Sequence, residues 1–401
     1  MQNPPTRTQV AIIGAGPAGL LLAHLLHRRG IDTVVLESRD RSYVERRQRA
    51  GILEQGTVDI LRATGAGRRM DRQGLRHDGI ELRFGGESHR IDFPSLTGGR
   101  SVMVYAQTEV VKDLIGLRLD EDQPILFEAE ALEISGIDGD SPQVRYRRRG
   151  QEHTLACDVV AACDGFHGIG RRSLPGADTF ERVYPFSWLG VLADVPPSCE
   201  ELIYAHHPEG FALHSMRSPE VSRLYLQVSP DERLENWSDA RIWDELANRF
   251  AVDGGWELGT GPITDKSITP MRSFVTEPMR HGRLFLAGDA AHIVPPTGAK
   301  GLNLAAADVT LLAAALLRWY RTGDEGGLDS YSADALRRVW RAEHFSYLMT
   351  SMLHAQPSRD PFELRLQLAQ LHYTATSAAA ATSLAENYVG LPLPGAEDIV
   401  E

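Results

Sequence analysis

The stretch Gln9-Val10-Ala11-Ile12-Ile13-Gly14-Ala15-Gly16-Pro17-Ala18-Gly19 decides the fold of this 401-residue chain. It joins a short apolar run, typical of a buried parallel strand, to a turn rich in glycine. Residues 20–29 then have the pattern of a helix, which Gly30 stops, and residues 33–36 form the next apolar run. The chain therefore begins with a strand, a helix and a second strand, and the glycine-rich turn lies where the first strand meets the helix.

The glycines of this turn fit the G-x-G-x-x-G pattern of dinucleotide-binding proteins. Gly14 allows the tight turn, Gly16 lets the backbone approach a pyrophosphate, and Gly19 lets the helix pack on the strand. Glu37 follows the second strand, at about the spacing expected for a carboxylate that accepts from ribose hydroxyls. Together these residues predict that the chain binds a dinucleotide, but they do not distinguish FAD from NAD(P).

A second turn, Gly288-Asp289-Ala290-Ala291-His292, follows a buried apolar run at 284–287. Its place far downstream suggests that the chain returns to hold the second half of a long flavin dinucleotide. Asp289 is placed to accept from the hydroxyls of a ribityl chain. A helix then opens at about 298–304, and its positive end, reinforced by Lys300, is expected to face the negative charge of a reduced flavin.

The rest of the chain divides into regions of different texture. Short alternating segments predict strands over 77–104 and 184–266, a β-meander is expected over 129–134, 143–148 and 153–162, and helices are expected over 108–119, 239–249 and most of 301–384. We predict an FAD-binding domain over 1–180, rejoined by about 272–310, a β-rich substrate domain over 181–290, and a helical C-terminal region with a dimer interface over 291–401.

Composition narrows the possible partners. The net charge of −12 gives no basic field for nucleic acid. The longest apolar run, at 309–317, is too short to span a membrane. The N-terminus lacks the pattern of a signal peptide, and three cysteines without a CxxC pair favour a reducing cytoplasm. No cluster of side chains has the spacing of metal ligands, so we expect no metal, no nucleic acid and no membrane partner.

The motifs resemble a known family. Segments 14–19, 49–56, 163–167, 204–208, 288–304 and 385–392, which cover the chain from end to end, are similar to the single-component flavin aromatic hydroxylases, and most of all to those that act on 4-hydroxybenzoate. The resemblance implies an FAD-binding, doubly wound, Rossmann-like domain of the GR2 type, a β-sheet substrate domain, a helical C-terminal region and a homodimer. It also implies that 4-hydroxybenzoate, O2 and NAD(P)H react on FAD to give 3,4-dihydroxybenzoate, through a flavin hydroperoxide that attacks an electron-rich ring.

The resemblance also assigns expected roles to single residues. Three residues are expected to hold the substrate carboxylate: Ser215, Arg217 and Tyr225. Tyr204 is expected to accept from the phenolic oxygen and Tyr388 to bond Tyr204, leading towards His77 at the solvent end of a proton relay, while the carbonyl of Pro296 faces the phenol. The expected FAD contacts are Gly14, Gly16, Gly19, Glu37, Arg47, Arg49, Gln107, Asp164, Asp289, Gly298, Leu302 and Asn303. The expected NAD(P)H contacts are Arg39, Tyr43, Arg49, His167, Arg171 and Arg272.

Two questions stay open in the sequence. Ser38 follows Glu37 where NADPH-specific members of the family carry an arginine; Arg39 or Arg41 is placed to meet a 2′-phosphate but Asp40 opposes it, so the choice between NADPH and NADH is undecided. The alternatives to 4-hydroxybenzoate are another phenolic acid or, in a different class, a non-catalytic flavin- or nucleotide-binding protein. The Trp-x-Trp-x-Ile signature of flavin halogenases is absent from the sequence.

Overall fold

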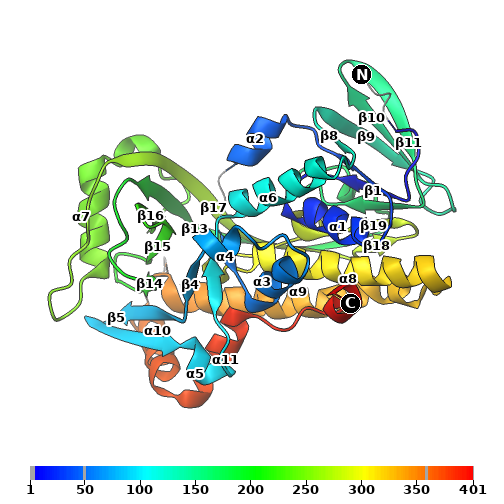
Figure 1. Ribbon diagram of the computed structural model, residues 1–401. Helices are drawn as coiled ribbons and strands as arrows, with labels where there is room; N and C mark the ends of the chain where they lie inside the picture. Colours follow the sequence, from blue (N-terminus) through cyan, green and yellow to red (C-terminus); the bar gives the residue numbers. More distant parts are fainter. Residues whose placement is uncertain (1–4, 48–50, 357–359, 401) are drawn as a thin grey trace.

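The computed structural model describes residues 5–47, 51–356 and 360–400. One layer is a six-stranded sheet in the order β18-β19-β12-β1-β2-β8 (Figure 1). Its strands are β1 (Val10–Ile13), β2 (Thr33–Leu36), β8 (Ile125–Leu126), β12 (Val159–Ala162), β18 (Arg280–His281) and β19 (Leu284–Leu286). Neighbouring strands run parallel except for β18 and β19. The sheet confirms the predicted α/β fold, including the late return of the chain to its edge.

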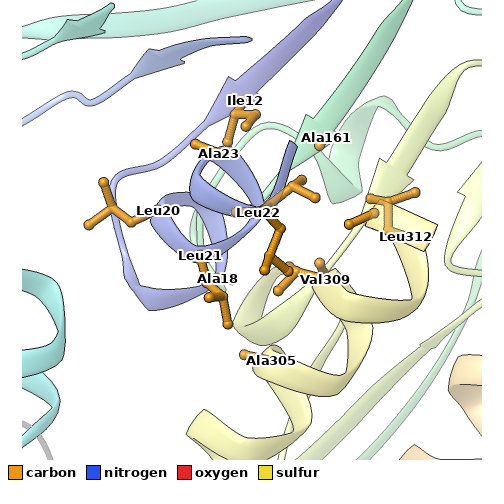
Figure 2. Packing of buried hydrophobic residues seen from close by; sticks show 14 of the residues in the cluster. Ile12, Ala18, Leu20, Leu21, Leu22, Ala23, Ala161, Ala305, Val309 and Leu312 are labelled. Atoms are coloured by element: carbon orange, nitrogen blue, oxygen red, sulfur yellow. The ribbon is translucent and has the colours of Figure 1, made fainter. Parts of the chain in front are cut away.

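Two core helices pack together on this sheet. α1 (Pro17–His27) begins three residues earlier than predicted, because Gly16 has the extended backbone of an N-cap and Pro17 suits the first helical position. Residues 18–26 are all buried, so α1 is a core helix. Figure 2 shows Leu22 of α1 beside Val309 of α8 (Gly301–Thr322). By length and composition α8 matches a membrane-crossing helix, but 78% of its most apolar window is buried inside the protein.

The predicted β-meander is shorter than expected. β9 (Ala129–Ser135), β10 (Gln143–Arg148) and β11 (Gln151–Ala156) form a three-stranded antiparallel sheet. The chain then leaves this sheet, and β12 pairs in parallel with β1 instead. The reason is burial: all four residues of β12 are apolar and buried, whereas Leu155 is the only buried residue of β11.

The second large layer is an eight-stranded sheet in the order β20-β17-β13-β16-β15-β14-β5-β6. Its strands are β5 (Gly79–Phe84), β6 (Glu87–Asp92), β13 (Asp178–Ala193), β14 (Leu202–Ala205), β15 (Ala212–Ser218), β16 (Val221–Val228), β17 (Ile263–Glu277) and β20 (His292–Ile293). α7 (Asp239–Phe250) packs on it through Ile242 and Leu246. β5 and β6 come from the first third of the chain, so a single boundary at residue 180 does not separate the two layers.

A small sheet and the remaining helices connect the layers. β3 (Ile52–Leu53), β4 (Leu75–His77) and β7 (Val102–Val104) form the antiparallel sheet β3-β7-β4. The long helices α8 and α9 (Gly326–Leu353) lie side by side across the molecule (Figure 1). The other helices are α2 (Arg41–Arg46), α3 (Gln55–Ala63), α4 (Met70–Gln73), α5 (Phe93–Thr97), α6 (Gln107–Asp120), α9 (Gly326–Leu353), α10 (Pro361–Thr376), α11 (Ala378–Val389) and α12 (Ala396–Val400), with short 3-10 turns at η1 (Arg171–Ser173), η2 (Leu234–Asn236), η3 (Gly288–Ala290) and η4 (Pro296–Gly298).

Candidate active site

The glycine-rich turn between β1 and α1 has the geometry that its three glycines predict. Gly14 has a φ of 102°, and a Cβ there would lie 2.4 Å from the carbonyl oxygen of Cys163. A Cβ on Gly19 would lie 2.0 Å from the carbonyl oxygen of Gly14. At Gly16, by contrast, a Cβ would meet no atom of the described chain within 4 Å. The outer two glycines are therefore needed for packing, and the middle one faces open space of the kind that a pyrophosphate requires.

Glu37 closes the far side of this turn. One carboxylate oxygen accepts from the backbone N–H of Ala15 at 2.9 Å, and the other accepts from the backbone N–H of Arg39 at 2.8 Å. The carboxylate thus lies at the end of β2 and beside the turn, where a ribose is expected. Its position follows from the parallel pairing of β1 and β2, which brings their carboxyl ends to the same edge of the sheet.

The turn at η3 is fixed by a buried pair of side chains, Asp308 and His292. Asp308 of α8 accepts from the backbone N–H of Gly288 at 2.9 Å and lies 2.6 Å from Nε2 of His292. Burial alone would lower the pKa of His292, but the adjacent Asp308 carboxylate outweighs burial and the pKa is raised. The side chain of Asp289, between these fixed points, is exposed. The turn therefore presents a free carboxylate on a rigid support.

These features fit a flavin dinucleotide. The open space at Gly16, the exposed Asp289 and the beginnings of α1 and α8 supply room, a hydrogen-bond acceptor and main-chain donors. Gln107 begins α6, Gly298 ends η4, and Leu302 lies in the first turn of α8. Arg47 is exposed after α2, and Arg49 lies outside the described residues.

Asp164 supports a loop. Its Oδ2 accepts from the backbone N–H of Gly170 at 2.8 Å, and a Cβ on Gly168 would lie 2.0 Å from its Cγ. Burial raises the pKa of this carboxyl group. The side chain therefore fixes the loop after β12, and its Oδ1 is buried without a partner among the described residues.

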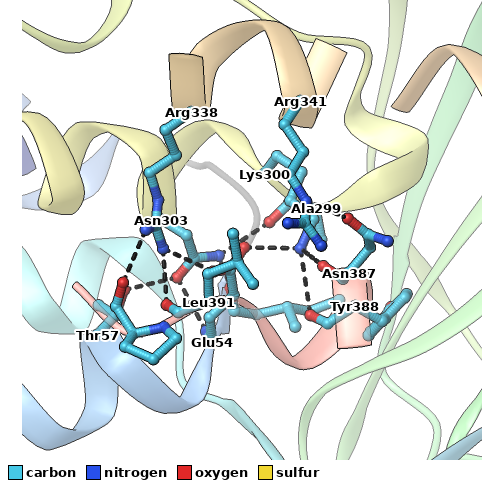
Figure 3. A network of polar contacts seen from close by, with 12 residues as sticks. Glu54, Thr57, Ala299, Lys300, Asn303, Arg338, Arg341, Asn387, Tyr388 and Leu391 are labelled. Atoms are coloured by element: carbon cyan, nitrogen blue, oxygen red, sulfur yellow. Dashed lines mark hydrogen bonds and ion pairs between the residues drawn. The ribbon is translucent and has the colours of Figure 1, made fainter. Parts of the chain in front are cut away.

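Two residues at the start of α8 point away from the expected flavin position. The ammonium of Lys300 is 2.7 Å from Oε1 of Glu54 and also donates to the carbonyls of Asn387 and Tyr388 (Figure 3). Lys300 is 4% exposed, and a buried ammonium needs an opposite charge, which Glu54 supplies. Its positive charge is thus paired within the protein, and its effect on the flavin stays a prediction.

The side chain of Asn303 is used within the protein. Its Nδ2 donates to the carbonyls of Ile52 and Ala299, both at 2.9 Å, and its Oδ1 accepts from Glu54 N and Thr57 Oγ1, both at 2.9 Å (Figure 3). These four bonds saturate the amide. Asn303 lies in the first turn of α8, where backbone N–H groups lack helical partners. We therefore expect its contact with FAD to be made by the backbone N–H and not by the side chain.

The residues expected to hold a carboxylate lie on two paired strands. Ser215 and Arg217 belong to β15, and Tyr225 of β16 lies opposite Leu213 in the antiparallel ladder. Arg217 donates to Oγ1 of Thr108 at 2.8 Å, and Ser215 donates to the carbonyl of Arg223 at 3.0 Å. Burial lowers the pKa of Arg217 and raises that of Tyr225, and the positive charges of Arg223 and Arg217 partly oppose the rise at Tyr225. The structure thus brings together a half-buried guanidinium, a hydroxyl and a phenol.

Tyr204 of β14 meets Tyr388 of α11 beside this group. Their hydroxyl oxygens are 2.6 Å apart, and both side chains are almost fully buried. Burial raises the pKa of both phenols, and the bond to Tyr388 partly opposes the rise at Tyr204. Phe93 stacks on Tyr388 with 5.0 Å between ring centroids. The pair is therefore neutral at physiological pH and is able to pass a proton without holding charge.

His77 lies at the end of β4 and is 1% exposed. Its two ring nitrogens have no hydrogen-bond partner among the described residues, and burial lowers its pKa to about 4. His77 is thus buried rather than at the surface, and its place in a proton relay stays a prediction. His77 is connected to Tyr388 through packing: the carbonyl of Asp78 accepts from the backbone N–H of Phe93, whose ring stacks on Tyr388.

The residues expected to contact NAD(P)H fall into two groups. Arg171 and Arg272 lie over the ring of Phe166, at 4.4 and 4.9 Å from its centroid, and the ring of His167 meets its edge at 5.1 Å. Arg39 lies over Tyr43 at 5.2 Å on the exposed helix α2. Sequence reasoning missed Phe166 as the centre of the first group and Thr108 as the partner of Arg217. Aromatic and hydroxyl residues carry no motif, so only the fold reveals them.

The protein is similar to flavoproteins over nearly its whole length. The family model described as "FAD binding domain" matches residues 7–346. A p-hydroxybenzoate hydroxylase of Acinetobacter baylyi is 51% identical over 388 residues, which are 96% of each chain. An aklavinone 12-hydroxylase of Streptomyces peucetius is 28% identical and covers 81% of this chain and 71% of its own. In structure, a p-nitrophenol 4-monooxygenase of Pseudomonas putida covers 96% of this chain and 99% of its own, with a TM-score of 0.82 at 22% identity.

Proposed function

Because this chain belongs to the FAD-dependent aromatic hydroxylases whose FAD-binding domain it carries, we propose that it hydroxylates 4-hydroxybenzoate at the 3-position to give 3,4-dihydroxybenzoate. Its enzyme class, its FAD cofactor and its NAD(P)H reductant follow from the family. The choice of substrate is supported by one arrangement: Arg217 acts on the pKa of Tyr225, Tyr225 acts on that of Tyr204, and Tyr204 bonds the neutral Tyr388. A carboxylate and a phenol at opposite ends of one ring match these two groups.

The carboxylate end of the substrate is assigned to β15 and β16. The guanidinium of Arg217 is able to donate two parallel hydrogen bonds to a carboxylate, and the phenol of Tyr225 adds a third. The bond from Arg217 to Thr108 fixes the guanidinium before the substrate arrives. Since burial lowers the pKa of Arg217, an incoming anion relieves the cost of the buried charge.

The phenol end is assigned to Tyr204 and Tyr388. Tyr204 accepts the phenolic proton while it donates its own to Tyr388, so that the ring gains electron density for attack at the carbon next to the oxygen. Pro296, which is exposed at the start of η4, presents its carbonyl from the cofactor side. When bound, FAD takes electrons from NAD(P)H and activates O2, so that one oxygen atom reaches the ring and the other leaves as water.

The test is a titration of the purified, FAD-loaded protein. Adding 4-hydroxybenzoate is expected to change the flavin absorbance and to stimulate NAD(P)H oxidation with matching formation of 3,4-dihydroxybenzoate. The 2- and 3-hydroxy isomers are the controls, because they place the hydroxyl away from Tyr204. Turnover of another isomer with no product from the 4-hydroxy acid would assign a different phenolic substrate. If the protein binds FAD but none of the three hydroxybenzoates stimulates NAD(P)H oxidation, the result would support the non-catalytic alternative.

The choice of reductant remains open between NADPH and NADH. Binding of NADPH, with its additional 2′-phosphate, is favoured by the exposed Arg39 and by the cluster of Arg171, Arg272 and His167. Asp40 caps α2 by accepting from Tyr43 N at 2.8 Å, and this bond keeps its pKa low, so its negative charge persists beside Arg39. Comparison of kcat/KM for the two coenzymes in the wild type and in Asp40→Asn tests whether that charge sets the preference.

The proposal includes a homodimer in the cytoplasm. Large apolar side chains are exposed on β13 and α9, and Phe180 meets Trp340 edge to face with 5.6 Å between centroids. Further exposed apolar residues are Val183, Tyr347, Leu348, Phe362, Leu366 and Tyr373. A second copy of this chain would cover such a surface. Light scattering of the wild type and of Phe180→Asp tests the dimer, and the three free cysteines accord with a reducing compartment.

A further inference from the structure

His354, the C-cap residue that directly follows α9, is enclosed by aromatic rings. Its side chain is fully buried and lies between Phe186 and Phe211, with 4.4 Å between ring centroids on each side. Its Nε2 lies 2.7 Å from Nε1 of Trp188, and its Nδ1 lies 2.9 Å from the carbonyl oxygen of Thr350. Both ring nitrogens therefore have partners, and none of the roles described so far uses this imidazole.

These partners fix the charge and the tautomer of His354. The indole N–H of Trp188 only donates, so Nε2 must accept; the carbonyl of Thr350 only accepts, so Nδ1 must carry the proton. Both requirements are met by the neutral imidazole alone. Burial also lowers the pKa of His354 to about 3. The ring is therefore a fixed hydrogen-bonding link at any pH at which the enzyme works.

One end of this link reaches the carboxylate side of the substrate site. The ring of Trp188 lies 4.8 Å from that of Tyr225, and the ring of Phe211 lies 6.2 Å from that of Tyr204. Trp188 is 3% exposed, so its indole N–H has no access to water if His354 is removed. The orientation of Trp188, and with it the wall against Tyr225, thus depends on the Nε2 acceptor.

The other end reaches the turn on the cofactor side. Oγ1 of Thr350 donates to Oγ1 of Thr297 at 2.9 Å, and both side chains are fully buried. Thr297 directly follows Pro296, whose carbonyl is assigned to the phenol end of the substrate. The last turn of α9 therefore bonds both to the wall of the substrate site and to the turn that faces the flavin.

We propose that His354 is a positioning residue that fixes the Trp188–Tyr225 wall relative to the Pro296–Thr297 turn. The residue acts through Trp188 and Thr350, and it sets the distance between the carboxylate site and the carbon that is oxygenated. The inference rests on the proposed function for its catalytic consequence. Its structural part, the bond from His354 to Trp188, does not depend on which substrate is used.

The structure offers a variant that should fold. His354→Phe keeps a flat ring between Phe186 and Phe211 but removes the acceptor. The adjacent residue Ala355 remains tied to the sheet, because its N–H donates to Oε1 of Gln227 at 3.0 Å and its carbonyl accepts from Nε2 of Gln227 at 2.8 Å. Trp188→Phe is the matched variant, since it removes the donor of the same bond. His354→Gln, which restores an acceptor without the ring, is the conservative rescue.

The first measurement is free of substrate. The indole N–H resonance of Trp188, assigned by its loss in Trp188→Phe, is expected to be strongly protected from hydrogen exchange in the FAD-loaded wild type. Protection should fall by about tenfold or more in His354→Phe, because a buried donor loses its partner, and His354→Gln should recover part of it. Unchanged exchange in His354→Phe would overturn the inference, whatever the substrate is.

The second measurement is a double-mutant cycle on affinity and coupling. His354→Phe and Trp188→Phe are each expected to weaken 4-hydroxybenzoate binding about tenfold and to lower the product formed per NAD(P)H consumed. The double variant should be no worse than either single one, because all three lack the same bond. Effects that multiply, or an affinity and coupling within about twofold of wild type, would contradict the positioning role. If the wild type does not bind 4-hydroxybenzoate, the proposed function fails, and the cycle is decided with the isomer that it does bind.

Discussion

The hydroxyl oxygens of Tyr204 and Tyr388 lie 2.6 Å apart, although one belongs to a strand of the eight-stranded sheet and the other to a helix near the C-terminus. Burial keeps water away from both hydroxyl groups, so each one serves as the hydrogen-bond partner of the other. The contact also joins two parts of the chain that the sequence keeps far apart.

Removing one hydroxyl of this pair separates binding from chemistry. Tyr388→Phe leaves the ring stacked on Phe93 but breaks the route by which Tyr204 passes a proton onward. We expect hydroxylation to fall by about 100-fold, while the affinity for 4-hydroxybenzoate stays within a few-fold, because the carboxylate contacts remain. Stopped-flow turnover and flavin titration measure the two quantities. Equal losses in both would contradict the relay.

Arg217 is expected to control affinity. Arg217→Ala should weaken binding of 4-hydroxybenzoate by about 10- to 100-fold, because charge-assisted hydrogen bonds to the carboxylate are lost. Arg217→Lys should recover only part of the loss, since an ammonium does not match a carboxylate with two parallel bonds. The amide analogue of the substrate is the control. If the wild type and Arg217→Ala discriminate the acid from the amide equally, Arg217 does not hold the carboxylate.

The three glycines of the first turn predict three different outcomes. Gly14→Ala should destabilise the fold by about 1–3 kcal/mol or more, since its φ of 102° and the nearby Cys163 carbonyl both oppose a side chain. Gly16→Ala meets open space, so the apoprotein should unfold at the temperature of the wild type while FAD binds more weakly. Thermal unfolding and FAD content distinguish the cases. Weakened apoprotein stability in Gly16→Ala would contradict this interpretation.

The low pKa of His77 predicts that the free energy of unfolding falls in acid. Its pKa is about 4 in the fold and 6.5 as the reference value, so the unfolded chain binds a proton that the native protein does not. Its contribution is therefore complete above pH 6.5 and is lost as the pH falls towards 4, by about 3 kcal/mol when fully expressed. Urea unfolding at pH 7.5 and pH 5 should show a smaller difference in His77→Gln than in wild type. The exposed His167→Gln is the control, and an identical pH dependence in all three proteins would refute the prediction.

The sequence predicted the parts of the fold that local patterns determine. The unit β1-α1-β2 and its glycines are encoded within about thirty neighbouring residues, so their geometry follows the prediction closely. The tyrosine pair and the carboxylate group came instead from resemblance to relatives, because no local pattern brings Tyr204, Arg217 and Tyr388 together. The structure places them in one region, while their roles stay predictions.

The polar contacts that the sequence did not predict share a physical cause. Lys300 was expected to add to the field of a helix start, and Asn303 to contact FAD by resemblance, but both bond Glu54, which lies 246 and 249 positions away from them in the chain. His77 was expected near solvent because histidine usually exchanges protons with water, but packing around β4 buries it. Partners that are distant in sequence decide where a polar side chain turns, and periodicity does not report them.

The pairing of β12 with β19 has a consequence for synthesis on the ribosome. β12 ends at Ala162, but its outer neighbour β19 is Leu284–Leu286, so the parallel sheet keeps an open edge while more than a hundred further residues are made. The hairpin of β5 and β6 likewise gains its neighbour only when β14, at Leu202–Ala205, has been made. While residues 163–201 are made, the nascent chain therefore carries two unpaired strand edges at once, and such edges are the part of an unfinished sheet most exposed to pairing with another chain.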